Sequence, residues 1–166
     1  SDGTTYKIRV STGVSSISGN TLSSQYETTN GFTTELPSYV AVGSSGGIHT
    51  STDGSTWTER TSGTDHSLYG ITYGNSTFLA VGGSGHSSGV ILTSSDGITW
   101  SSQLKSGDNN VFRAVAYGNS TFVIVGRNGK ILISSDGWSN TNWADVSISS
   151  RDLLDITYGN IFELYK

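Results

Sequence analysis

The hydrophobic residues of this chain fall in short clusters at strand spacing. Residues 69–74, "YGITYG", alternate between apolar and polar positions, and residues 77–82, "TFLAVG", are nearly all apolar. Alternation is typical of a strand with one buried face, whereas a short apolar run between turn residues fits a strand buried on both faces. No window shows the 3.6-residue period of a helix, so we expect essentially no helix.

The clusters repeat along the chain. The stretch "YGNSTFLAVGG", from Tyr73 to Gly83, returns almost unchanged as "YGNSTFVIVGR", from Tyr117 to Arg127. A related copy begins upstream at Tyr39, and "ITYGNIFELYK" opens another copy downstream. A period of about 40 residues is typical of propeller blades.

Each full copy predicts four strands separated by turns. In the two best copies the predicted strands are 69–74, 77–82, 90–94 and 99–104, then 113–117, 121–126, 130–134 and 143–147. Gly74-Asn75 and Asn128-Gly129 are two-residue hairpin signals, because these residue types tolerate a positive φ.

A four-stranded unit of this size cannot bury both of its faces alone, but units stacked around an axis can. We therefore predict an all-β fold, a β-propeller or partial propeller of four-stranded antiparallel blades. Residues 37–166 hold about three blades and part of another. For residues 1–36, a predicted N-terminal β segment, two alternatives stay open. Either the segment supplies the outer strand of a split blade, or it is separate and other chains or further sequence finish the propeller.

Three turns share a Ser-x-Asp-Gly sequence and are called the Asp-Gly turns below. The first reads "STDGSTW" and the second "SSDGITW", whereas the third keeps "SSDG" but has three extra residues before its Trp. Their shared residues are Ser51, Asp53, Gly54 and Trp57; Ser94, Asp96, Gly97 and Trp100; and Ser134, Asp136, Gly137 and Trp143.

The residue types of these turns predict a structural role. The carboxylate can accept hydrogen bonds from amides of its own turn, Gly supplies a positive φ, and Trp covers the edge of the sheet. One carboxylate per loop is too few for a calcium site. We therefore expect no metal site and no cofactor.

The Asp-Gly turns resemble the Asp-box (BNR) repeat, in a form one residue shorter than the usual one. The resemblance covers residues 39–166, and three turns recur in register with the rest of the repeat. It implies a β-propeller in which the boxes lie at the blade periphery and are structural. Propellers of this family occur in sialidases, other glycosidases, secreted bacterial proteins and phage virion proteins.

Composition excludes several classes of partner. The net charge is −4 with scattered Lys and Arg, so we expect no nucleic-acid partner. No run of about 18 apolar residues is present, so we expect no membrane insertion. The chain has neither Cys nor Met. It therefore has no disulfides, and we expect it to be a processed product or a segment of a longer protein. His49, His66 and His86 occupy unmatched repeat positions, which favours ordinary surface residues over zinc ligands.

Four residues are the candidates for binding. His86 lies in the "GGSGHSSG" hairpin, which is four residues longer than its counterparts. Trp138 lies in the enlarged third Asp-Gly turn and is a candidate exposed aromatic. Arg113 and Arg151 each precede a predicted first strand, where they could approach a central channel.

These observations predict a non-enzymatic binding or structural module, extracellular or on a virion surface such as a phage tail fibre. Its expected ligand is a cell-surface glycan or a protein, and it is expected to form a homo-oligomer or part of a larger assembly. No catalytic residue is assigned. The alternative is a sialidase-like glycoside hydrolase or a fragment of one, which would need two carboxylates facing one bond.

Overall fold

A computed structural model describes most of the chain. It describes residues 37–85, 88–103, 111–137, 142–148 and 150–159, together with four short strands near the N-terminus. The chain divides into two compact units, residues 1–36 and 37–166. In the first unit, β1 (Thr4–Tyr6) pairs with β4 (Phe32–Thr34), and β2 (Arg9–Val10) pairs with β3 (Tyr26–Glu27), both antiparallel. The contribution of residues 1–36 to a split blade stays a prediction.

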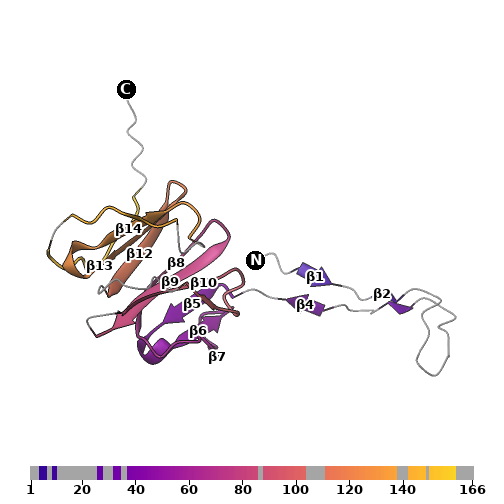
Figure 1. The fold of residues 1–166 in the computed structure, drawn as a ribbon. Coiled ribbons are helices and arrows are strands. Elements are labelled where there is room, and N and C mark those ends of the chain that lie inside the picture. Colours follow the sequence, from indigo (N-terminus) through magenta and orange to yellow (C-terminus); the bar gives the residue numbers. More distant parts are fainter. Residues whose placement is uncertain are drawn as a thin grey trace, which may run out of the picture. The chain divides into compact units, whose positions relative to one another are not determined.

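The second unit contains three antiparallel sheets (Figure 1). The first sheet is β5 (Tyr39–Val42), β6 (Ile48–Ser51) and β7 (Thr58–Arg60). The second sheet is β8 (Leu68–Gly74), β9 (Thr77–Ser84), β10 (Ser88–Ser94) and β11 (Ser101–Ser102). The third sheet is β12 (Phe112–Gly118), β13 (Thr121–Gly126), β14 (Ile131–Ser134) and β15 (Ala144–Asp145).

Within each of these three sheets, every strand pairs with the next strand along the chain. The predictions of an all-β fold and of two four-stranded sheets are therefore confirmed. The only helical elements in the described part of the chain are two single 3₁₀ turns, η1 (Ser44–Gly46) and η2 (Arg127–Gly129). The outer strand β11 is shorter than predicted because the amide of Thr99 belongs to the Asp-Gly turn, where it donates to Asp96.

One hairpin prediction was wrong by a residue. The turn after β8 is formed by Asn75 and Ser76, with φ of 46° and 56°, while Gly74 is paired with Thr77 in the ladder. The Thr77 hydroxyl donates to the Asn75 carbonyl and closes this turn. The predicted turn at Asn128-Gly129 is confirmed, with φ of 54° and 68°.

Gly74 is required by a neighbouring sheet, not by its own turn. A Cβ on Gly74 would lie 2.1 Å from Cγ of Tyr117, whose ring packs on this glycine from β12. The first strands of the second and third sheets also approach closely at Gly70, where a Cβ would lie 2.9 Å from Cα of Ala114. Short residues at these two positions therefore set the spacing between the sheets.

Two apolar clusters fill the spaces between the sheets. The cluster between the first and second sheets contains Ile48, Leu68, Ala80, Val90 and Leu92. The cluster between the second and third sheets contains Leu79, Val81, Ile91, Phe112, Val115, Phe122, Ile124, Leu132 and Trp143. The second sheet is thus buried on both faces, as its nearly continuous apolar strand β9 indicated.

Residues 150–159 continue the stack beyond the third sheet. A Cβ on Gly118 would lie 2.0 Å from Cγ of Tyr158, which repeats the Gly74–Tyr117 contact. The amide of Leu153 donates to the Gly126 carbonyl, as the amide of Leu68 donates to the Gly43 carbonyl at the boundary between the first and second sheets. The segment therefore lies where the first strand of a fourth sheet would lie, although it pairs with no strand in the described part of the chain.

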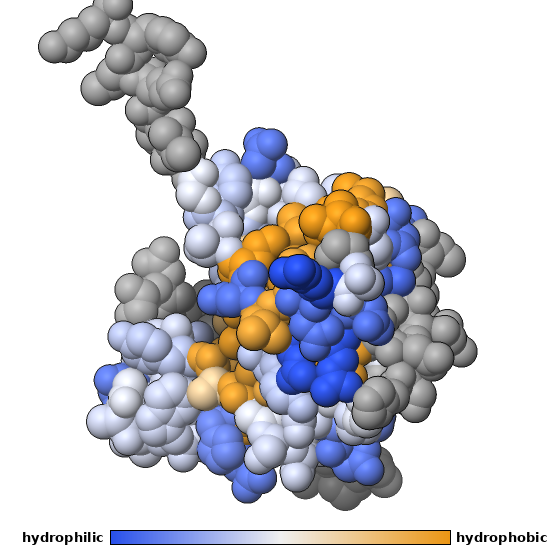
Figure 2. All heavy atoms as spheres, turned by 90° about the vertical axis from the view of Figure 1, so that its left-hand side faces the viewer, coloured by the Kyte–Doolittle hydropathy of each residue, from blue (hydrophilic) through white to orange (hydrophobic). Residues whose placement is uncertain are grey.

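The two ends of the stack leave apolar side chains at the surface. Tyr39 and Trp57 of the first sheet are 53% and 43% exposed, and Leu154 and Tyr158 beyond the third sheet are 69% and 50% exposed. Figure 2 shows apolar side chains reaching the surface as a band across one face of the molecule.

Candidate functional site

The first two Asp-Gly turns have the same hydrogen bonds. In the second, the Ser94 hydroxyl donates to Oδ1 of Asp96 (2.9 Å) and accepts the amide of Gly97 (2.8 Å). The same Oδ1 accepts the amides of Ile98 (2.8 Å) and Thr99 (2.7 Å). The first turn repeats these four bonds around Asp53. The carboxylate thus serves its own turn.

The glycines of these turns have two roles. They take φ of 78°, 72° and 69°, which favours Gly over other residues. Gly97 and Gly137 also make contact with the preceding sheet. A Cβ on Gly97 would lie 2.9 Å from Pro37 and 3.4 Å from Val40, and one on Gly137 would lie 3.0 Å from Leu79. The second and third turns therefore help to space the sheets.

The burial of the Trp residue of each Asp-Gly turn depends on the position of its sheet in the stack. The indoles of Trp57 and Trp100 donate to the carbonyls of Gly54 and Gly97 in their own turns. Trp143 is 6% exposed and packs in the cluster between the second and third sheets, and its buried indole nitrogen has no hydrogen-bond partner. Trp57 is 43% exposed, because no sheet precedes the first one in the second unit.

The carboxyls of the first two turns have lowered pKa values. The amides of Thr56 and Ser55 lower the pKa of Asp53. Burial raises the pKa of Asp96, but the amides of Thr99 and Ile98 together lower it below the ordinary 3.8. A lowered pKa means that the folded state holds the ionised form more strongly than the unfolded chain does.

We expect this difference to make the fold acid-labile. As the pH falls, the unfolded chain takes up protons first, so the turn carboxylates stabilise the fold above the ordinary pKa and lose that contribution below it. The free energy of unfolding should therefore begin to fall near about pH 5 and fall most steeply below the ordinary pKa of 3.8. Asp96→Asn should flatten that decline in urea titrations. If the free energy of unfolding fell equally steeply with pH in wild type and in Asp96→Asn, the Asp96 carboxylate would not be a cause of the acid lability.

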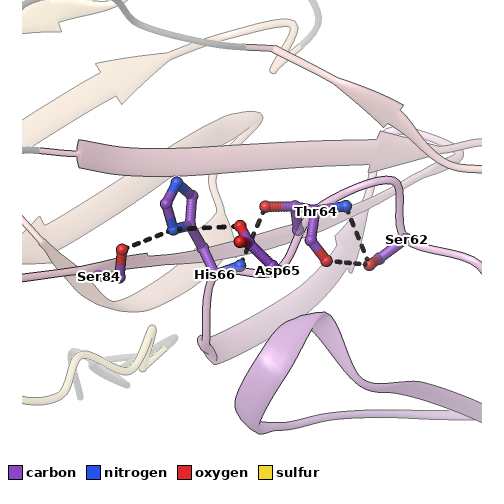
Figure 3. Close-up of polar contacts among 5 residues, drawn as sticks. All are labelled: Ser62, Thr64, Asp65, His66 and Ser84. Atoms are coloured by element: carbon purple, nitrogen blue, oxygen red, sulfur yellow. Dashed lines mark hydrogen bonds and ion pairs between the residues drawn. The ribbon is translucent and has the colours of Figure 1, made fainter.

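Asp65, His66 and Ser84 lie together but do not form a catalytic triad (Figure 3). The Ser84 hydroxyl lies 2.6 Å from Nδ1 of His66, and a carboxylate oxygen of Asp65 lies 3.8 Å from the same nitrogen. A Ser-His-Asp triad needs the hydroxyl on one ring nitrogen and the carboxylate on the other. The contact instead ties the loop before β8 to the end of β9.

Similar contacts join loops of all three sheets at one end of the strands, called the loop end below. Ser62 donates to the Thr64 carbonyl, and a Cβ on Gly46 of η1 would lie 1.9 Å from that carbonyl oxygen. Further along, Arg127 donates to the Gly85 carbonyl, and Asp152 accepts the amide of Asn128. The loop end thus consists of residues 44–46, 61–66, 84–85 and 127–128 with Asp152.

The Asp-Gly turns lie at the opposite end of the strands. Ser94, where the second turn begins, pairs with Phe78 beside the Asn75-Ser76 hairpin, whereas the far end of β9 pairs at Ser84 with Ser88. At the turn end, polar groups bond within their own turns. At the loop end they form longer connections between sheets, where binding residues are usually found.

Two open hollows lie at the loop end. One, of about 510 Å³, is lined by Ser45, Gly46, Gly47, Glu59, Arg60, Thr61, Ser62, Gly63 and Thr64. The other, of about 550 Å³, is lined by Ser45, Gly63, Thr64, Asp65, His66, Val90 and Ser102. Both are lined mainly by hydroxyl, charged and glycine residues.

The four sequence-predicted binding residues are not gathered at these hollows by any described contact. Arg113 places its guanidinium 4.7 Å from the centre of the Tyr69 ring, and its Nε is buried without a hydrogen-bond partner. Arg151 is exposed. His86 and Trp138 lie outside the described residues. No group of three or more potential metal ligands occurs among the residues that the structure describes.

Comparisons with protein-family models, with curated proteins and with solved structures find no match for this chain. Among the described residues, no helix is long and apolar enough to cross a membrane.

Sequence reasoning missed the residues that line the hollows. Glu59, Arg60, Asp65 and His66 differ from their counterparts in the other repeats, so no repeated motif marked them. The composition of the loop before β8 could have indicated them. This loop connects the first sheet to the second and contains Ser, Gly, Thr, Asp and His residues.

Proposed function

We propose that residues 37–166 belong to an Asp-box β-propeller that acts as a non-enzymatic binding module and holds a polar ligand at its loop end. The observation that carries this proposal is the joined loop end itself. Among its loops, Arg127 donates a hydrogen bond to the Gly85 carbonyl and Gly46 packs against the Thr64 carbonyl, and two open hollows are lined mainly by residues 45–47 and 59–66. A surface fixed in this way costs little conformational entropy when a ligand binds.

The propeller is supported by the way in which the sheets stack. The contact of Gly74 with Tyr117 and the contact of Gly118 with Tyr158 are equivalent, so the same packing arrangement recurs at two successive boundaries of the stack. The Asp-Gly turns, which resemble Asp boxes, recur at the same end of each sheet. Repetition of one step around an axis is what generates a propeller.

A glycan is the ligand class that fits the hollows best. Their walls present hydroxyls from Ser45, Thr61 and Thr64, which can both donate and accept hydrogen bonds. Acidic and basic groups, such as Glu59 and Arg60, lie in the same wall, so no single sign of charge is selected. A hydroxyl-rich neutral or weakly charged sugar matches such a surface. We place the module outside the cell or on a virion surface, because of its Ser-, Thr-, Gly- and Asn-rich composition and its resemblance to proteins found there.

A glycan array with the full chain tests this proposal. We expect selective binding to a small set of glycans, reduced at least tenfold by the double variant Glu59→Ala/Asp65→Ala, since each hydrogen bond to a charged group is worth about 1.5–3 kcal/mol. Ser95→Ala, at an exposed site of the turn end, is the matched control and should bind like wild type.

Three outcomes would contradict the proposal. They are failure to bind any glycan, binding that the loop-end variant leaves unchanged, and turnover of a fluorogenic sialoside. Capture of one protein that competes at the loop end would replace the glycan with a protein ligand.

A further inference from the structure

The first sheet has an open strand position. In the second sheet, β9 pairs with β8 on one side and with β10 on the other, and β13 is likewise flanked in the third sheet. In the first sheet, β5 holds the equivalent place but pairs only with β6 in the described residues. The edge of β5 next to the open position therefore lacks the partner that its counterparts have.

The repeated glycine after β5 marks the same open position. A Cβ on Gly82 would lie 2.0 Å from the Ser67 carbonyl oxygen, and one on Gly126 would lie 2.4 Å from the Val111 carbonyl oxygen. These oxygens belong to the segments that lead into β8 and β12. At Gly43, the equivalent residue of the first sheet, no atom lies within 4 Å of such a Cβ.

The residues just before β5 cannot occupy the open strand position beside it, because they cannot form the two-residue hairpin that joins the first two strands of the other sheets. In those hairpins the second turn residue, Ser76 or Ser120, has φ of 56°. The equivalent turn residue before β5 is Pro37. Its ring fixes φ near −65°, so it cannot adopt the positive φ of this turn. The structure instead pairs β4 with β1.

Residues 153–159 occupy the matching first-strand position of the repeat, but they pair with no strand in the described part of the chain. Their counterparts by repeat, β8 and β12, pair with β9 and β13 through Tyr73 opposite Phe78 and Tyr117 opposite Phe122. Applied to β5, this register sets Tyr158 opposite Tyr39.

We propose that two copies of this chain exchange these strands, so that residues 153–159 of each copy pair with β5 of the other. The exchange completes the first sheet of both copies and gives one closed assembly of two chains. This inference goes beyond ligand binding. The pairing itself follows from the register, and only the choice of a second copy rests on the proposed propeller.

Side chains on both elements suit this pairing. Tyr73 and Phe78 have ring centres 4.5 Å apart, and those of Tyr117 and Phe122 are 4.6 Å apart. Tyr39 and Tyr158 would form the third such pair, and both are about half exposed in the single chain. Cross-strand aromatic pairs stabilise sheets.

The next residue of the strand fits as well. Tyr117 covers Gly74 and Tyr158 covers Gly118, but Tyr73 covers no glycine among the described residues and is 56% exposed. Gly159 has open space where its Cβ would be. Strand exchange places Gly159 of the partner copy under Tyr73 and so completes the series.

The outer faces of the stack are complementary in the same way. The first sheet exposes Tyr39 and Trp57 at the repeat positions where Phe122 and Trp143 are buried against the second sheet, and Trp57 lines a hollow of about 380 Å³. The far face of the third sheet carries Val123, Ile131 and Ile133, which are only partly buried. These faces correspond to the two sides of the existing interfaces between sheets.

The number of sheets favours two copies over closure of one. Propellers contain about four to eight blades. A single chain that inserted its own strand would close a ring of three sheets, below that range, whereas two chains that exchange strands provide six.

Cysteine cross-linking tests the exchange, because the chain has no native Cys. The register sets Ile156 opposite Ala41, so separately purified Ala41→Cys and Ile156→Cys chains should form a disulfide-linked heterodimer when mixed. Ala41→Cys mixed with Thr157→Cys, whose side chain faces the other side of the strand, is the matched control and should remain unlinked. The wild-type mass in solution should be twice the 17.5 kDa of one chain.

Gly43→Val tests the interface without cross-linking. The side chain has open space in the single chain but would meet the exchanged strand, so the fold should persist by circular dichroism while dimer affinity falls at least tenfold. The proposal would be overturned by a wild-type monomer, by dimers that lack the cross-link between Ala41→Cys and Ile156→Cys chains, or by covalent ladders longer than two chains. It would also be overturned if a chain that carries both Ala41→Cys and Ile156→Cys formed the disulfide only within itself. A Gly43→Val protein that dimerises like wild type would contradict it as well. None of these experiments depends on glycan binding, so the two proposals fail separately.

Discussion

Gly74→Ala is expected to lower the free energy of unfolding by about 3 kcal/mol, the upper part of the usual range for an overpacked core. The added methyl group would lie 2.1 Å from Cγ and 2.2 Å from Cδ1 of Tyr117. These atoms lie near the base of a ring that packs against Phe122, so the ring cannot simply swing away. Relief requires the second and third sheets to move apart.

A double-mutant cycle with Tyr117→Ala isolates this contact. Tyr117→Ala alone should destabilise the chain through lost packing, but in its presence Gly74→Ala should cost only a few tenths of a kcal/mol, because the space is then open. Urea unfolding of the four proteins gives the coupling energy. Additive effects of the two substitutions would contradict packing of the Tyr117 ring on Gly74.

Asp145→Ala is expected to destabilise the chain by about 2–3 kcal/mol, below the 3–5 kcal/mol found when a fully buried ion pair is broken. Nζ of Lys130 lies 2.6 Å from Oδ2 of Asp145, and the lysine side chain is only 8% exposed. Lys130 also lowers the pKa of Asp145, with a further contribution from Ser147. Removal of the carboxylate leaves a nearly buried ammonium group without this partner.

The repeat supplies the control for this prediction. In the second sheet the position of Lys130 is occupied by Val90, which is 1% exposed. Lys130→Val/Asp145→Ala should therefore recover most of the stability that Asp145→Ala loses, because no charge is then buried. A double variant as unstable as the single one, measured in the same urea titration, would show that the ion pair does not explain the loss.

The strands could be predicted from the sequence because local pattern and tertiary burial agree. The apolar run of β9 is buried between two sheets, and the alternating run of β8 forms the neighbouring strand. The bounds of the outer strands could not be predicted, because residues with strand propensity, such as Thr99, belong to the Asp-Gly turn instead. The displaced hairpin has a related cause. Gly74 resembles a turn glycine in sequence, but the Tyr117 ring of another sheet explains it.

The candidate site was less predictable than the fold. The hydrogen bonds of the Asp-Gly turns follow from residue types a few positions apart, and the structure contains them. The loop end depends on contacts between residues far apart in the chain, such as Arg127 with Gly85 and His66 with Ser84. These residues occur once each and not in every repeat, so periodicity could not reveal them.

Successive sheets of this chain stack by one repeated step, and residues 150–159 take the next position in the stack. The most direct measurement is the NMR signal of the glycine Hα protons that lie under the two tyrosine rings. Ring-current shifts to high field are expected for Gly74 and Gly118, with nuclear Overhauser contacts to Tyr117 and Tyr158 respectively. Ordinary glycine shifts without these contacts, in a chain that is otherwise folded, would contradict this repeated stacking.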